Sequence, residues 1–219
     1  MAKTVPPKPL FIMLYGFPGA GKTYFARQFC EQVQAAHIQG DRIRAELFEQ
    51  PRYDKQENQV VTQLMDYMAE EFLSAGISVV YDTNAARAIQ RHGLRDLARK
   101  AGAKPLLVWF QVDADSSFFR SSKRDRRRAD DKYSASLSRP MFDAQITTMQ
   151  NPVQTEDFIV ISGKHTFPTQ FAAVTRKLRE QGLYGIGDGS QVAKPGMVNL
   201  IPNQPSGRVD MGRRNITIR

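Results

Sequence analysis

The hydrophobic positions of this chain alternate between short continuous apolar runs and longer segments with helical spacing. The apolar runs have the length of buried strands and occur at residues 10–15, 36–39, 77–81, 106–112 and 157–162. Between them, apolar residues recur every three or four positions, as on one face of a helix. These helical segments lie at about 22–35, 42–48, 57–75, 86–101, 115–128, 139–149 and 168–181. Strands that are apolar along their whole length are typical of a parallel sheet. The pattern predicts a three-layer α/β fold in which helices cover both faces of a parallel sheet.

The same pattern divides the chain into one domain and two flanking segments. Residues 1–8 are rich in proline and lysine and predict a flexible N-terminal lead. Residues 9–181 carry the strands and helices, and a chain of 219 residues suits one α/β domain with some additional length. From residue 182 onward Gly, Pro and Asn become frequent and helical periodicity disappears. We expect residues 182–219 to form a β-hairpin-like extension; the alternative is a disordered tail.

Residues 16–23 read Gly-Phe-Pro-Gly-Ala-Gly-Lys-Thr and match the P-loop motif G-x-x-x-x-G-K-[ST]. The motif stands between a predicted strand and a predicted helix. Glycines let the backbone turn its N–H groups toward phosphate oxygens, and the helix N-terminus adds the positive end of its dipole. We expect Lys22 to reach the β- and γ-phosphates and Thr23 to bind Mg²⁺. The loop predicts binding of a nucleoside triphosphate, or descent from a fold that bound one. The expected ATP-binding residues are Gly16, Pro18, Gly19, Ala20, Gly21, Lys22 and Thr23.

A carboxylate and an arginine, Asp41 and Arg44, follow the second predicted strand. Phosphoryl transfer to an alcohol needs a group that takes or orients the hydroxyl proton, and a carboxylate suits this role. An arginine one helical turn further on can hold a phosphate of the acceptor or neutralise the transferring group. The alternative is that Asp41 caps a helix and that Arg44 is solvated. The nearby P-loop strand favours the functional interpretation of both residues.

The strand at 77–81 is followed by Asp82, at the position where P-loop proteins carry the Walker-B carboxylate. Such a carboxylate reaches Mg²⁺, usually through water, or contacts the acceptor. The alternative is that Asp82, Thr83 and Asn84 form a turn that caps the next helix. Ligands of parallel α/β sheets bind at the carboxyl ends of the strands. The P-loop, Asp41 and Asp82 all fall at such ends, which predicts a single active site with Thr23 and Asp82 as metal ligands.

The chain is strongly basic, with 31 Lys and Arg against 22 Asp and Glu and a formal net charge of +9. The excess fits either a nucleic-acid partner or a site built around nucleotide phosphates. Basic residues crowd positions 120–128, where Asp125 is the one acidic residue. An arginine on a closing lid can stabilise the charge of a transferring phosphoryl group, and a lid also excludes water. We expect a lid at about 120–138; a nucleic-acid contact surface is the alternative.

Cysteine usage and apolar content indicate the compartment. Cys30 is the single cysteine, so the chain has no internal disulfide, which suits a reducing environment. No apolar run approaches the ~20 residues that a membrane helix needs. The N-terminal residues lack the apolar region of a signal peptide. These features predict a cytoplasmic protein without a membrane partner, and no obligate protein partner is evident.

The ordered set of motifs resembles that of the P-loop kinases of the polynucleotide-kinase type, a group with adenylate-kinase-like folds. Those kinases share the P-loop, an Asp-x-x-Arg after strand two, a Gly-x-x-Val-[Val/Ile]-x-Asp-x-Asn at strand three, an Arg-x-x-x-Arg lid and a Pro-x-x-x-Glu before the last strand. Here these motifs occupy residues 16–23, 41–44, 76–84, 124–128 and 152–156. The resemblance implies that Asp41 is the general base, that Arg44 anchors the acceptor and that Arg128 is the lid arginine. It makes Arg124 a second lid candidate that contacts ATP, and it places Asp82 and Asn84 on the acceptor side.

These expectations converge on an ATP- and Mg²⁺-dependent kinase that moves the γ-phosphoryl group to a hydroxyl acceptor. Its expected catalytic residues are Lys22, Asp41 and Arg128. A nucleic-acid 5′-hydroxyl is the leading acceptor because of the Asp-x-x-Arg pair and the basic balance. A small molecule, such as a sugar, a nucleoside or a nucleotide sugar, is the alternative. A further alternative is a non-catalytic ATP-binding module, although ATP binding alone requires neither Asp41 nor the lid arginines.

Overall fold

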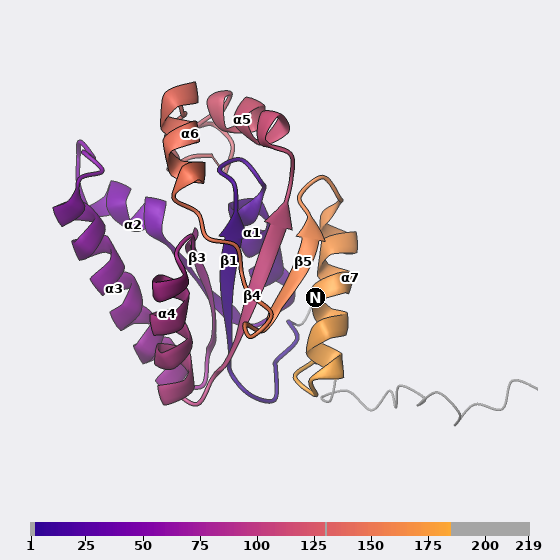
Figure 1. Ribbon diagram of the computed structural model, residues 1–219. Coiled ribbons are helices and arrows are strands. Elements are labelled where there is room, and N and C mark those ends of the chain that lie inside the picture. Colours follow the sequence, from indigo (N-terminus) through magenta and orange to yellow (C-terminus); the bar gives the residue numbers. More distant parts are fainter. Residues whose placement is uncertain (1–2, 130, 185–219) are drawn as a thin grey trace, which may run out of the picture. The chain divides into compact units, whose positions relative to one another are not determined.

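A parallel β-sheet forms the centre of the domain (Figure 1). The computed structural model describes residues 3–129 and 131–184. Within them, five strands pair in the order β2-β3-β1-β4-β5, and every neighbouring pair is parallel. In chain order the strands are β1 (Leu10–Gly16), β2 (Ala35–Gln39), β3 (Ser78–Asn84), β4 (Lys104–Gln111) and β5 (Phe158–Ser162). The predicted parallel α/β sheet is confirmed, with strand ends within a few residues of those expected.

Helices connect the strands and cover both faces of the sheet. In chain order they are α1 (Lys22–Gln32), α2 (Gly40–Leu47), α3 (Lys55–Ser74), α4 (Ala88–Lys100), α5 (Ala114–Ser122), α6 (Arg139–Thr147) and α7 (Phe167–Glu180). Buried residues of α1 and α7 share one hydrophobic cluster with alternate residues of β1, namely Leu10, Ile12 and Leu14. Phe11 and Met13 point to the opposite face and join the cluster with α3 and α4. The alternation along β1 therefore produces the three predicted layers.

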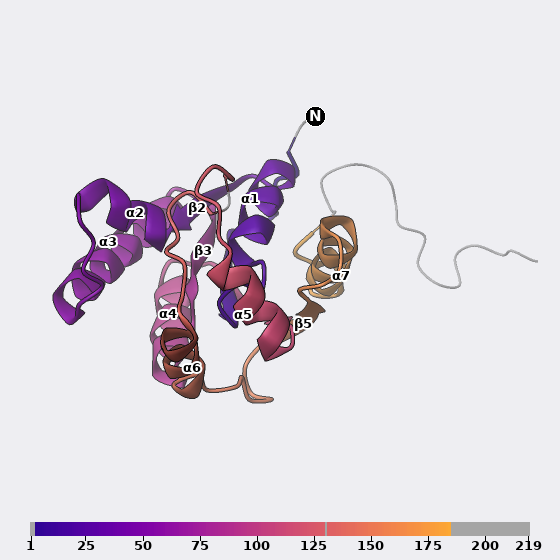
Figure 2. The same ribbon diagram turned by 90° about the horizontal axis from the view of Figure 1, so that it is seen from above.

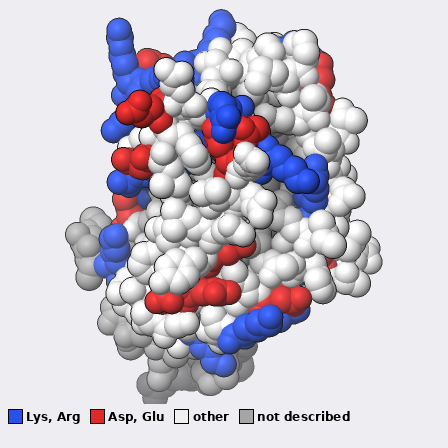
Figure 3. All heavy atoms as spheres, turned by 90° about the vertical axis from the view of Figure 1, so that its left-hand side faces the viewer, with Lys and Arg blue, Asp and Glu red and all other residues white. Residues whose placement is uncertain are grey.

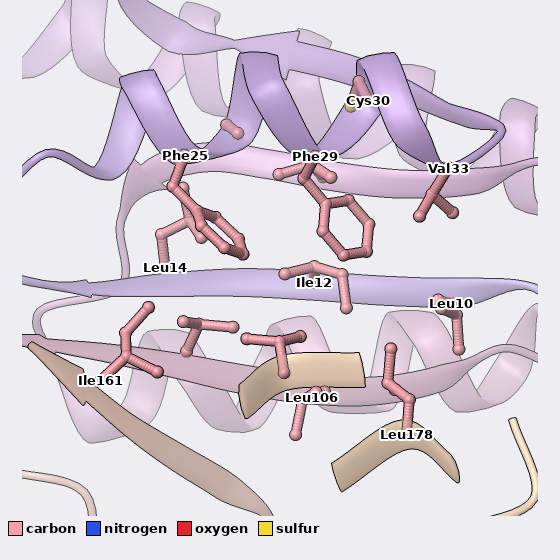
Figure 4. Close-up of a cluster of buried hydrophobic side chains, with 14 of the residues drawn as sticks. Leu10, Ile12, Leu14, Phe25, Phe29, Cys30, Val33, Leu106, Ile161 and Leu178 are labelled. Atoms are coloured by element: carbon pink, nitrogen blue, oxygen red, sulfur yellow. The ribbon is translucent and has the colours of Figure 1, made fainter. Parts of the chain in front are cut away.

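Aromatic side chains of α1 fix that helix on the sheet. Phe25 and Phe29 are fully buried, and in Figure 4 they lie between α1 and the side chains of Leu14 and Ile12. Burying one side chain of this size stabilises the fold by about 1.5–3 kcal/mol. Because α1 begins directly at the P-loop, this packing also holds the loop at the carboxyl end of β1.

The carboxyl ends of the strands lie at one edge of the sheet, and that edge is covered by α5 and α6. Figure 2 looks onto this edge and shows the two helices above the strand ends. The P-loop follows β1, Asp41 lies in the first turn of α2 after β2, and Asp82 lies near the end of β3. The three expected parts of the site therefore share this edge.

The basic segment differs from the sequence expectation of a helix over 115–128. Helix α5 ends at Ser122, and residues 123–129 form bends and turns. The physical reason is composition: residues 123–128 contain no apolar side chain to bury, and like charges one helical turn apart destabilise a helix. The arginine-rich part of the expected lid at 120–138 is consequently a loop, and this segment keeps the name lid below.

Both flanks of the domain pack more closely than expected. Thr4 of the N-terminal lead pairs with Val33 through its backbone, which ties the lead to the end of α1. Beyond the expected boundary at 181, Leu183 and Tyr184 are buried in the α1–α7 cluster. The expected β-hairpin-like extension otherwise lies outside the described residues. No helix in the described ranges is long and apolar enough to span a membrane.

Candidate active site

The P-loop backbone takes conformations that require glycine. Gly19 and Gly21 have φ angles of 84° and 94°, in the left-handed region that other residues rarely adopt. A Cβ atom on Gly19 would also collide with the backbone of Ser117 in α5. Gly21 is the N-cap residue of α1 and provides no side-chain cap. The first N–H groups of α1 therefore have no capping side chain and suit a phosphate group.

Lys22 folds back over the loop that precedes it. Its Nζ donates hydrogen bonds to the carbonyl oxygens of Gly16 (2.7 Å) and Phe17 (2.9 Å). Burial lowers the pKa of Lys22 to about 8, and the carboxylate of Asp82 acts in the opposite direction. The ammonium group thus lies at the mouth of the loop, where the motif requires it to meet the phosphates.

Thr23 and Asp82 lie together beside the P-loop. The Oγ1 of Thr23 donates to Oδ1 of Asp82 (3.3 Å), and the Nε2 of His37 lies 2.9 Å from Oδ2 of the same carboxylate. Mg²⁺ prefers oxygen ligands and in nucleotide sites is held by one or two protein groups together with phosphates and water. The hydroxyl and the carboxylate supply such ligands, so this pair fits a magnesium–nucleotide complex.

His37 was not among the site residues predicted from the sequence, although it contacts the carboxylate of Asp82. His37 is in β2, and β2 pairs with β3 so that His37 is opposite Val80 and Gln39 is opposite Asp82. Knowledge of the strand order β2-β3-β1 would have predicted this contact, because that order places the end of β2 beside Asp82 on β3. Periodicity alone does not give that order.

Asp41 lies close to the P-loop lysine and contacts the lid. Its Oδ2 accepts a hydrogen bond from Oγ of Ser134 (2.7 Å), a buried residue between α5 and α6. Asp41, Asp82 and Arg124 all act electrostatically on Lys22. The structure thus gathers the P-loop, both expected carboxylates and the base of the lid in one site.

The two lid arginines differ in position. Arg124 donates from Nη1 to the carbonyl oxygen of Ala135 (2.8 Å), which closes the two ends of the lid segment on each other. Arg128 is exposed, and its backbone N–H donates to the carbonyl oxygen of Asp125 in a turn. The charge of Arg124 also acts electrostatically on Lys22.

Arg44 is a buried residue of α2, and its side chain pairs with α3. Its Nη1 donates to Oε2 of Glu57 (2.9 Å) and its Nη2 to Oδ1 of Asn58 (2.5 Å). The guanidinium also lies over the ring of Tyr53, 4.7 Å from its centroid. In this arrangement Arg44 joins α2 to α3, and its charge is already paired with Glu57.

Asn84 contacts the P-loop itself. Its Oδ1 accepts the backbone N–H of Gly16 (3.3 Å), and its Nδ2 lies 3.8 Å from the sulfur of Met149. These contacts tie the end of β3 to the first residue of the loop and to the segment after α6. Asn84 is thus placed to position the P-loop.

A second buried ion pair supports the segment that leads to β5. Arg91 of α4 is fully buried and donates to both carboxylate oxygens of Glu156 (2.7 and 2.9 Å). Its Nη1 also donates to the carbonyl oxygens of Ala85 and Gln150. Glu156 belongs to the Pro-x-x-x-Glu motif, so that motif has a structural partner in Arg91.

A cavity of about 600 Å³ lies beside the P-loop, at the ends of β4 and β5. Tyr15, Trp109 and Val160 line it, together with Asn151 and Lys164. The hydroxyl of Tyr15 donates to Oδ1 of Asn151 (2.9 Å). The cavity lies across β1 from the carboxylates Asp41 and Asp82, because β3 and β2 are on the other side of β1.

Fold and site together define a P-loop NTPase of the kinase fold. Its parts are a parallel sheet with helices on both faces, the loop between β1 and α1, and two carboxylates, Asp41 after β2 and Asp82 on β3. The chain belongs to the family described as the AAA domain, which matches residues 11–152. No curated protein matches the sequence.

Solved structures of two kinases and of the protein Kti12 share this fold. A gluconokinase from Sinorhizobium meliloti 1021 is 15% identical, with a TM-score of 0.58 over 79% of this chain and 93% of its own. The APS kinase of Mycobacterium tuberculosis in complex with AMPPNP and APS is 18% identical, with a TM-score of 0.55 over 80% and 99%. Kti12 of Chaetomium thermophilum in complex with ADP-AlF3 is 14% identical, with a TM-score of 0.54 over 75% and 98%. At these identities the likeness establishes the fold.

Proposed function

We propose that this protein is an ATP- and Mg²⁺-dependent phosphotransferase that moves the γ-phosphoryl group of ATP to an alcohol. One observation carries the proposal. The Asp41 carboxylate acts electrostatically on Lys22, and it accepts a hydrogen bond at 2.7 Å from an alcohol group of the chain itself, the Ser134 hydroxyl. A candidate general base must lie within about 2.6–3.2 Å of the group whose proton it takes. A module that only binds ATP has no need of this arrangement.

The residues would divide the reaction between them. The P-loop amides and Lys22 bind the phosphates, and Asp41 holds the acceptor hydroxyl and takes its proton as the oxygen attacks the γ-phosphorus. Arg124, at the base of the lid, balances charge on the transferring group. Bound Mg²⁺, held by Thr23 and Asp82, would neutralise charge on the β- and γ-phosphate oxygens. The closed lid keeps water away from the transferring group.

Three observations favour a small acceptor over a nucleic-acid 5′-end. The guanidinium of Arg44, expected to hold an acceptor phosphate, is paired with Glu57 beneath the surface. In addition, Figure 3 shows acidic side chains interspersed with basic ones on the face that carries α2 and α3, where a nucleic acid would need a continuous basic surface. The gluconokinase and APS kinase that share the fold are named for small acceptors. The exposed arginines of the lid loop, Arg126 to Arg128, are the feature that favours nucleic acid.

An acceptor screen tests the proposal. Labelled ATP and Mg²⁺ would be offered with sugars, nucleosides and nucleotide sugars, and in parallel with 5′-hydroxyl oligonucleotides. We expect label in a small alcohol; label in the oligonucleotide would restore the polynucleotide-kinase-type function. The variant Asp41→Asn should bind ATP with unchanged affinity and transfer phosphate about 10²–10⁴-fold more slowly.

Three results would contradict parts of this scheme. Normal transfer by Asp41→Asn would remove Asp41 from the role of base. Transfer by Lys22→Met at the wild-type rate would exclude the P-loop as the phosphate site. ATP binding with transfer to no acceptor would leave the non-catalytic binding module as the function.

A further inference from the structure

A buried serine of the lid occupies the place of an acceptor alcohol. Ser134 is 5% exposed, and its Oγ donates to Asp41 Oδ2 at 2.7 Å, which joins residues 93 positions apart in the chain. A hydroxyl that donates to a carboxylate at this distance makes a charge-assisted hydrogen bond, among the stronger kinds in proteins. It is also the geometry in which a general base engages the hydroxyl that it activates.

The lid holds Ser134 in this position through several backbone contacts. The N–H of Ser134 donates to the carbonyl oxygen of Asp131 (3.1 Å), and the N–H of Leu137 donates to that of Ser121 (3.3 Å). The next residue, Ala135, accepts from the guanidinium of Arg124 (2.8 Å). Because the backbone is fixed on both sides of Ser134, its hydroxyl is directed at Asp41 by the fold of the lid.

The phosphate-binding groups are near the same hydroxyl. Asp41 and Arg124 both act on Lys22, whose Nζ lies at the mouth of the P-loop. The Ser134 hydroxyl, the Asp41 carboxylate and the P-loop lysine are therefore parts of one site. Holding reacting groups together in one site raises the rate of transfer between them.

We propose that Ser134 is itself a phosphoryl acceptor and that the protein phosphorylates it within the same chain. The inference rests on the proposed function, because it uses the same base and the same phosphate site. Ser134 Oγ attacks the γ-phosphorus of ATP as its proton passes to Asp41. The bond between the γ-phosphorus and the β–γ bridging oxygen breaks, ADP leaves, and Ser134 becomes phosphoserine.

The test uses the full chain with ATP and Mg²⁺ in the absence and presence of the external acceptors. Mass spectrometry would locate phosphate, and the rate would be measured over a range of protein concentrations. We expect one phosphate on Ser134, formed at a rate independent of protein concentration. Ser134→Ala should lose this phosphate. Ser136→Ala, an exposed serine two residues further on, is the matched control and should keep it.

The outcomes separate this inference from the proposed function. No phosphate on Ser134 while label reaches an external alcohol would overturn the inference and leave the proposed function intact. Phosphate on Ser134 and on none of the external acceptors offered would support the inference and exclude transfer to a separate alcohol. ATP binding with neither product would overturn both. A rate that rises with protein concentration would show transfer between molecules and overturn the same-chain step.

Discussion

At the scale of single residues, Lys22 is the side chain on which burial and charge act in opposite directions. Burial lowers its pKa to about 8, while the nearby carboxylates favour the charged form. The ammonium group is therefore only half charged at about pH 8, although an exposed lysine is half charged at about pH 10.4. The two carbonyl contacts of Lys22 supply acceptors that the ATP phosphates would replace.

This pKa predicts a pH dependence of ATP binding. The charged lysine attracts the phosphates, so the affinity for ATP should be highest below about pH 7 and should fall as the pH rises from about 7 to 9.5. The decline should approach tenfold per pH unit above the pKa, since a neutral lysine contributes no charge. Calorimetric titration of ATP at each pH measures it. Lys22→Met should bind ATP weakly at every pH in this window, and a decline in that variant as steep as in the wild type would assign the titration to another group.

Residues that repeat a known motif could be predicted from the sequence, whereas their partners could not. Lys22, Thr23 and Asp82 follow from the P-loop and from the end of a buried strand. Ser134 and His37 do not, because each reaches the site through contacts between segments distant in the chain. The hydrogen bond from Ser134 spans 93 positions, and that of His37 spans 45. Such pairs depend on tertiary packing.

At the scale of elements, the Arg44–Glu57 pair couples α2, which carries Asp41, to α3. Glu57 also accepts the backbone N–H groups of Arg52 and Tyr53, so it organises the whole α2–α3 connection. A buried ion pair is costly to break because one charge is left without a partner. This contact accordingly sets the position of the first turn of α2, where Asp41 lies.

Substitution of Arg44 distinguishes a structural role from acceptor binding. We expect Arg44→Met to lower the melting temperature by at least about 5 °C, because a buried charge is left unpaired. Its KM for the acceptor should change less than its kcat, since Asp41 loses its fixed position. Thermal unfolding and steady-state kinetics measure the two effects.

The control is Arg42→Met on the same helix, where the pair with Glu46 is exposed and 3.9 Å long. Its melting temperature should stay within about 2 °C of the wild type. A large rise in the KM of Arg44→Met for the acceptor, with an unchanged melting temperature, would show that Arg44 binds the acceptor.

Strands and most helices could be predicted from periodicity because each has a continuous apolar run or face to bury. The exception is α5, which was expected to continue to residue 128 and ends at Ser122. The helix was predicted too long because the charged residues at 123–128 have helical spacing but no apolar face to bury. The cavity between Tyr15, Trp109 and Lys164 also could not be predicted from the sequence. Its walls come from segments that are distant in the chain and meet only in the folded domain.

At the scale of the whole domain, the boundary lies beyond the last helix. Leu183 and Tyr184 are 7% and 9% exposed, and the backbone N–H of Leu183 donates to the carbonyl oxygen of Leu178 (2.8 Å). The ring of Tyr184 packs edge-on against Phe171, 6.1 Å between centroids. These contacts make residues 183–184 part of the hydrophobic core.

Two truncations test this boundary. A chain that ends at residue 181 loses the buried side chains of Leu183 and Tyr184, worth about 1.5–3 kcal/mol each, and should melt several degrees lower than the full chain. A chain that ends at residue 184 keeps both and should melt within about 2 °C of the full chain. Thermal unfolding of the three proteins measures the difference. Equal melting temperatures for the 181 and 184 chains would show that the two residues do not stabilise the domain.

The contact between Tyr184 and Thr4 has a practical consequence for how the protein can be labelled and immobilised. The tyrosine hydroxyl lies 3.3 Å from the threonine Oγ1, so the first and last residues of the described domain lie next to each other. That point is at the far end of α1 from the P-loop, about 16 Å along a helix of 11 residues. Affinity tags, fluorophores or surface linkers attached at either end of the domain will therefore be anchored away from the nucleotide entrance.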